Sequence, residues 1–93
     1  MLNHVVAFTL TDPADAAETQ ARIVALGPQI GAIRSITAGV DLLGDPGAAH
    51  VVLISTHDDV PGLRAYQEHP VHQEFGAWIR DRIAAKTVVD FEA

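Results

Sequence analysis

The stretch YQEHPVHQEF, residues 66–75, divides a helical segment into two parts. Pro70 cannot donate a backbone hydrogen bond, and the residue before a proline avoids the α region, so a helix is expected to end near His69. Pro70 also fits the first position of a new helix. The sequence therefore predicts two consecutive helices, with His69 at the break satisfying unpaired backbone groups of the second helix.

Apolar residues follow one face of each of these helices. Before the break, Val60, Leu63 and Tyr66 are three residues apart, and they follow an Asp58-Asp59 pair that fits an N-cap. After the break, the stripe consists of Phe75, Trp78, Ile79 and Ile83. Residues 86–92, KTVVDFE, then predict a closing strand.

Two strand patterns precede the helices. Residues 34–43, RSITAGVDLL, alternate between two faces, and residues 49–56, AHVVLIST, are rich in β-branched side chains. The sequence GDPGA between them is a turn signal. The two segments therefore predict an antiparallel hairpin.

The N-terminal part adds one strand and one helix. Residues 4–10, HVVAFTL, predict a strand, and the following TDPAD supplies Asp12 as N-cap and Pro13 as first helical residue. We expect the helix to run from about Ala14 and to fade by about Ile30. The order βαββαβ predicts a single α+β domain over residues 1–93, ferredoxin-like, with a four-stranded antiparallel sheet and helices on one face.

Aliphatic residues lie on both faces of the strands at 4–10 and 49–56. A sheet with one solvent-exposed face would alternate more regularly between apolar and polar residues. The chain is short and 48% of its residues are hydrophobic, so the core of one subunit is too small to bury all of them. The second apolar face predicts a homodimer joined sheet to sheet as a dimeric α/β barrel. The expected interface residues are Val5, Ala7, Val51, Leu53 and Ser55.

Composition excludes several other classes of protein. The net charge of −6 and the scattered six Lys and Arg residues argue against nucleic-acid binding. The absence of cysteine excludes disulfides and thiolate sites. The N-terminus lacks a basic region followed by a long apolar run, so neither a signal peptide nor a membrane span is predicted, and a cytoplasmic location is expected. No H-x-H or H-E-x-x-H pattern occurs, so no metal site is predicted, although histidines from different elements could converge on one.

Four motifs together resemble the stress-responsive A/B barrel (Dabb) family. They are H-V-V-x-F at 4–8, H-V-V-L at 50–53, Y-x-x-H-P-x-H-x-x-F at 66–75 and D-F-E at 90–92. The resemblance spans essentially the whole chain and implies the dimeric α/β barrel. Plant members of the family include a stress-induced, stable protein and a polyketide cyclase that works by aldol condensation without a metal or cofactor.

The resemblance also implies a pocket and its residues. The general acid/base histidine of the cyclase falls on His72, its tyrosine on Tyr66, and its two strand histidines on His4 and His50. The bulky aromatics of the plant pocket have no match in AAETQARIVAL, so the substrate stays open. The apolar substrate-binding wall would consist of Val6, Phe8, Val52, Ile54, Phe75 and Trp78.

Two kinds of function remain open at this stage. A histidine near neutral pKa at position 72 suits a general base, and the Tyr66 hydroxyl suits a donor to an enolate oxygen. The protein would then bind, or convert by aldol-type or related proton transfer, a small, mostly apolar, oxygen-bearing molecule. Alternatively, these side chains fill the core and satisfy one another, and the protein is a non-enzymatic, stable stress-response dimer with a structural or protective role.

Overall fold

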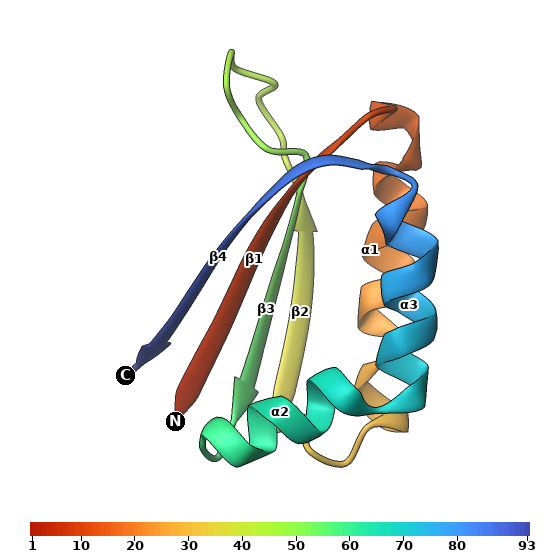
Figure 1. Ribbon diagram of the computed structural model, residues 1–93. Helices are drawn as coiled ribbons and strands as arrows, with labels where there is room; N and C mark the ends of the chain where they lie inside the picture. Colours follow the sequence, from red (N-terminus) through yellow and green to blue (C-terminus); the bar gives the residue numbers. More distant parts are fainter.

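The computed structural model describes residues 1–93 as one antiparallel sheet with every helix on the same face (Figure 1). The strand order is β2-β3-β1-β4, so β1 lies inside the sheet and β4 forms an edge. This arrangement confirms the predicted ferredoxin-like α+β fold. The strands are β1 (Leu2–Leu10), β2 (Ser35–Val40), β3 (Val51–His57) and β4 (Ile83–Glu92).

The first predicted helix is shorter than expected. It begins with a 3₁₀ turn, η1 (Pro13–Asp15), continues as α1 (Ala16–Val24), and is followed by a second 3₁₀ turn, η2 (Gly27–Gln29). Pro28 has no N–H for an α-helical bond, so the regular helix cannot continue through it. The other helices are α2 (Val60–Glu68) and α3 (Pro70–Arg80), and no helix in the chain is both long and apolar enough to cross a membrane.

Side-chain caps fix three of the helix starts. Asp12 accepts a hydrogen bond from the N–H of Ala14 at 3.0 Å, and Asp59 accepts one from the N–H of Gly62 at 2.8 Å. The Nδ1 of His69 accepts a hydrogen bond from the N–H of Val71 at 3.1 Å. The structural role predicted for His69 at the helix break is therefore confirmed.

The register between β1 and β3 decides which residues meet the helices. His4 pairs with Ser55, Val6 with Leu53, and Phe8 with Val51. Directly paired residues share a face, and all six of these are buried beneath the helices. Placing Val51, Leu53 and Ser55 at the dimer interface was therefore wrong. Both faces of β3 are aliphatic, so the alternation did not reveal which of them belongs to the core.

The other face of the sheet carries apolar residues that no helix covers (Figure 1). Val5 pairs with Ile54 and Ala7 with Val52, which places these four half-buried residues on the bare face. On β4, Val89 is 54% exposed and pairs with Val5 on the same face. A second apolar face therefore exists as predicted, but its β3 members are Val52 and Ile54.

Candidate functional site

Three imidazole rings surround the ring of Tyr66 below the break between α2 and α3. The ring centroid of His72 lies 4.5 Å from that of Tyr66, that of His57 5.0 Å away, and that of His4 6.1 Å away. The four rings come from β1, β3, α2 and α3. Residues far apart in the sequence thus form one aromatic and titratable cluster.

His72 lies in the first turn of α3, three residues after the cap His69. Its Nδ1–H donates a hydrogen bond to the carbonyl of Gln67 at 3.1 Å, and its Nε2 has no hydrogen-bond partner. Burial lowers the pKa of His72 below its ordinary value. The ring is therefore neutral at pH 7, and the unpaired Nε2 is the atom that can accept a proton.

The hydroxyl of Tyr66 is buried and makes no hydrogen bond. The residue is 0% exposed, and burial raises its pKa to about 12, so the phenol stays protonated at neutral pH. A buried polar group without a partner costs about 1–3 kcal/mol. Such groups in native proteins call for an explanation, and a functional role is one of the established ones.

His4 is held by a carboxylate from the edge strand. Its Nδ1 lies 2.5 Å from Oδ1 of Asp90, which is the residue directly across from it on β4. The carboxylate is an obligate acceptor, so Nδ1 carries the proton of this bond. Only Nε2 of His4 remains for a ligand.

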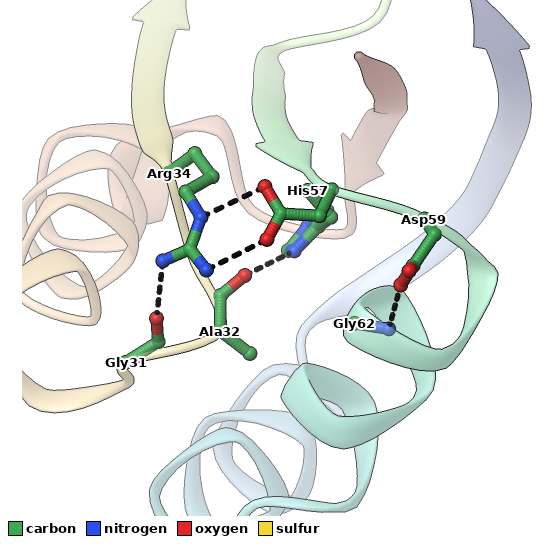
Figure 2. A network of polar contacts seen from close by, with 7 residues as sticks. Gly31, Ala32, Arg34, His57, Asp59 and Gly62 are labelled. Carbon is green, nitrogen blue, oxygen red and sulfur yellow. Dashed lines mark hydrogen bonds and ion pairs between the residues drawn. The ribbon is translucent and has the colours of Figure 1, made fainter.

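His57 belongs to the cluster, although no sequence motif points to it. Its Nδ1–H donates to the carbonyl of Ala32 at 2.9 Å, as Figure 2 shows, and its Nε2 accepts from the Ser55 hydroxyl at 2.9 Å. Burial lowers the pKa of His57, so the ring is neutral. Both nitrogens are occupied, which makes His57 a support for Tyr66 and not a proton acceptor. The clue in the sequence is the spacing S-x-H at 55–57, which places both side chains on one strand face.

An ion pair between Arg34 and Asp58 lies at the surface beside His57. The guanidinium of Arg34 donates two hydrogen bonds to the carboxylate of Asp58, at 2.8 and 2.9 Å, and a third to the carbonyl of Gly31 at 3.0 Å. Figure 2 shows Arg34 and Gly31 beside the His57–Ala32 bond. Asp58 therefore pairs with Arg34, and Asp59 alone caps α2. The pair holds the segment before β2 against the end of β3.

A cavity of about 160 Å³ opens beside His4 and His72, between α3 and the strands β1 and β4. A hollow of about 280 Å³ adjoins it and shares five wall residues, among them His72 and Gln67. Tyr66 is not part of either wall and packs behind the two histidines. The cavity walls include five of the predicted site residues, namely His4, Val6, Phe8, His72 and Phe75.

The remaining predicted residues lie elsewhere. His50, Val52 and Ile54 are on the bare side of the sheet, because the register places the alternate residues of β3 toward the helices. His50 lines a separate hollow of about 300 Å³ there, and its Nδ1 accepts a hydrogen bond from the N–H of Leu10 at 2.8 Å. That hollow is larger, but it contains none of the clustered rings. The resemblance implies one pocket for His4 and His50, but the structure places them in separate hollows.

Trp78 lies outside the cavity as well. The guanidinium carbons of Arg22 and Arg82 each lie 4.3 Å from its ring centroid, so two cations lie against the indole. Contacts of this kind stabilise a partly exposed indole by roughly 0.5–1 kcal/mol each. Trp78 is a packing residue between α1 and the end of α3. No three His, Asp or Glu side chains lie close enough together to hold a metal ion.

Comparison with known families identifies the fold family. The sequence matches the stress-responsive A/B barrel domain (Dabb) over residues 2–93. The chain belongs to this family. No curated protein matches the sequence of this chain.

Solved structures agree with the family assignment. A dimeric protein of ferredoxin-like fold from Bacteroides fragilis shares 26% identity with a TM-score of 0.85, covering 99% of this chain and 95% of its own. A dimeric ferredoxin-like protein from Thermobifida fusca shares 25% identity with a TM-score of 0.87, covering 99% and 90%. SnoaB, a cofactor-independent oxygenase from Streptomyces nogalater, shares 19% identity with a TM-score of 0.79, covering 99% and 91%, which shows a common fold alone.

Proposed function

We propose that this Dabb domain binds a small, mostly apolar, oxygen-bearing molecule in the cavity beside His4 and His72. We further propose that it catalyses proton transfer at carbon without a cofactor. The observation that carries this proposal is the unpaired, buried hydroxyl of Tyr66 beside the neutral ring of His72. A donor without an acceptor and a base with an unpaired nitrogen are the two groups that enolisation requires.

In the proposed reaction, His72 removes a proton from the ligand and later returns it. Nε2 of His72 removes the proton from a carbon next to a carbonyl group, and the electron pair of the C–H bond forms an enolate. The hydroxyl of Tyr66 donates a hydrogen bond to the enolate oxygen. In an aldol-type closure, the enolate carbon attacks a second carbonyl carbon of the same molecule, and the resulting alkoxide takes the proton from the His72 imidazolium.

His4 on β1 is a second group that can bind a ligand in the cavity. Asp90 holds its Nδ1, so its Nε2 can bind a ligand oxygen or water in the cavity. Tyr66 packs behind His4 and His72 and lines neither hollow, so its hydroxyl reaches a ligand oxygen only when these two rings move aside. We assign it the donor role because that oxygen would supply the acceptor that the hydroxyl lacks.

Hydrogen–deuterium exchange on a β-keto ester tests the proposal directly. Ethyl 3-oxo-3-phenylpropanoate in D₂O loses its α-proton signal in NMR spectra, and the protein-dependent rate is measured above the uncatalysed rate. His72→Ala should lower that rate by roughly 10²–10⁴, the usual effect of removing a positioned general base. His69→Ala is the matched control, since it removes a neighbouring histidine that caps α3, and its rate should stay near the wild-type value. Equal rates for His72→Ala and the wild type contradict the base assignment.

A non-catalytic role remains the second candidate, and one observation favours it. The Tyr66 side chain is 0% exposed and lines neither hollow, and both nitrogens of His57 are occupied, so this part of the cluster is closed to a ligand. The protein would then serve as a stable stress-response dimer. Absence of protein-dependent exchange, together with no change in unfolding temperature across a panel of phenolic, polyketide and lactone compounds, would support this role.

The bare face of the sheet supports a homodimer in either case. Two of the compared structures are described as dimeric proteins of ferredoxin-like fold. A second copy packed sheet to sheet would cover the uncovered apolar side chains. We assign to this interface the residues Val5, Ala7, Val52, Ile54, Val89 and Phe91.

A further inference from the structure

Lys86 is the only lysine of the chain, and it lies in the wall of both the cavity and the adjoining hollow. It pairs with Phe8 across β1 and β4, so its side chain is on the helix-covered face of the sheet. The next residues on this face are Val88 and Asp90. A charged side chain at such a position is either solvated at the edge or placed to meet a ligand.

The charges around the two hollows differ from those of the chain as a whole. The protein has twelve Asp and Glu residues against six Lys and Arg, yet no carboxylate is in the wall of either hollow. Arg80 contributes a second positive charge to the adjoining hollow. Neither Lys86 nor Arg80 forms an ion pair, whereas Arg22 and Arg34 both do. Two cations without partners thus face one opening in an acidic protein.

We propose that the ligand of this site carries a carboxylate, which the ammonium of Lys86 binds at the mouth of the cavity with support from Arg80. The inference rests on the proposed function and adds the chemical class of the ligand. The apolar body of the molecule would lie against Phe8 and Phe75, and its carbonyl end would reach His72. An oxygenated carboxylic acid, such as an aromatic or β-keto acid, fits this distribution of charge.

The position of Asp90 fixes the direction in which such a ligand lies. Lys86 and Asp90 are four residues apart on one face of β4, which is roughly 13 Å at about 3.3 Å per residue. A carboxylate at the His4 end would meet the like charge of Asp90. The anionic end therefore lies at Lys86, and the neutral oxygens lie toward His4 and His72.

An anion bound at Lys86 would also change the pKa of His72. Burial is the main cause that lowers the pKa of His72, and the positive charge of Lys86 contributes to it. A carboxylate paired with Lys86 would offset this contribution, so the contact that selects the ligand acts to raise the pKa of His72.

Two small molecules of similar size, one anionic and one neutral, test whether the site prefers a negatively charged ligand. We would measure the dissociation constants of 2-hydroxybenzoate and of its neutral analogue 2-hydroxybenzamide by NMR titration of the full chain at low and high salt. The carboxylate should bind about tenfold more tightly, as expected for one charge-assisted contact at a partly exposed site, and the preference should shrink as salt screens it. Lys86→Met should abolish the preference, Lys86→Arg should keep most of it, and Arg64→Gln, which removes the same charge from the exposed face of α2, should leave it unchanged.

Each result has a distinct meaning. Equal affinity of both probes for the wild type, or an undiminished carboxylate preference in Lys86→Met, overturns the anion inference and leaves the base role of His72 to the exchange experiment. Failure of both probes to bind at millimolar concentration overturns the anion inference together with the binding site. A carboxylate preference in a protein without exchange activity supports the anion site and contradicts the catalytic proposal alone.

Discussion

The Nδ1 of His4 and Oδ1 of Asp90, 86 residues apart in the sequence, lie 2.5 Å from each other across β1 and β4. Asp90→Asn removes the charge that orients the ring while keeping the side-chain size. A charge-assisted hydrogen bond contributes about 1.5–3 kcal/mol, so we expect the exchange rate to fall by about tenfold or more. The control is Asp45→Asn in the loop between β2 and β3. An unchanged rate in Asp90→Asn would show that the orientation of His4 has no part in the reaction.

Tyr66→Phe should separate stability from activity. The substitution removes a buried hydroxyl that has no partner, so the free energy of unfolding in urea should stay the same or increase by up to about 1–3 kcal/mol. The exchange rate should fall, because the enolate loses its donor. A clear loss of stability in Tyr66→Phe would mean that the hydroxyl has a structural partner in solution.

The pH dependence of exchange should reflect the lowered pKa of His72. Burial lowers this pKa below the ordinary value of about 6.5, so the base remains neutral in moderately acidic solution. We expect the rate at limiting low substrate concentration to fall to half of its plateau value only below about pH 6.5. A half-maximal rate above pH 6.5 would show that another group is the base.

Stability should also decrease in acid, for a related reason. The unfolded chain binds protons at its histidines near pH 6.5, whereas the folded pKa values of His57 and His72 are lower. Below about pH 6.5 the unfolded state therefore binds more protons, and the free energy of unfolding falls by at most about 1.4 kcal/mol per pH unit for each group. The contribution is constant above pH 6.5. His57→Asn, which keeps a donor for the carbonyl of Ala32, should reduce this slope between pH 6.5 and 5, and an unchanged slope would contradict the role of His57.

Adjacent residues on β3 should respond differently to a buried charge. Ile54→Asp introduces a carboxylate on the bare face, so the variant should fold but sediment as a monomer at micromolar concentration. Leu53→Asp places the charge in the core, where Leu53 is 2% exposed, and should unfold the protein. Val60→Asp, at the exposed start of α2, is the control and should leave the wild-type assembly unchanged. A wild-type protein that sediments as a monomer would contradict the sheet-to-sheet dimer.

Local chemistry in the sequence determined the order of the elements, the helix break at His69 and the caps at Asp12 and His69. These features depend on neighbouring residues only, since a proline removes its own N–H and a capping side chain bonds a backbone group two residues away. The motif at 66–75 also placed Tyr66 and His72 together, because it spans one short helix junction.

The tertiary structure decided which face of β3 meets the helices, and with it the membership of the site. A shift of one residue reverses every side chain of a strand, and β3 is aliphatic on both faces, so its alternation could not assign Val52, Ile54 and His50. The pairing of β1 with β3 and with β4 fixes the register of these strands, and it brings His57 and Asp90 to the cluster from distant parts of the chain. The contact of His4 with Asp90 exists only because the sheet pairs β1 with β4, and the contact of His57 with Tyr66 exists only because α2 packs against the sheet.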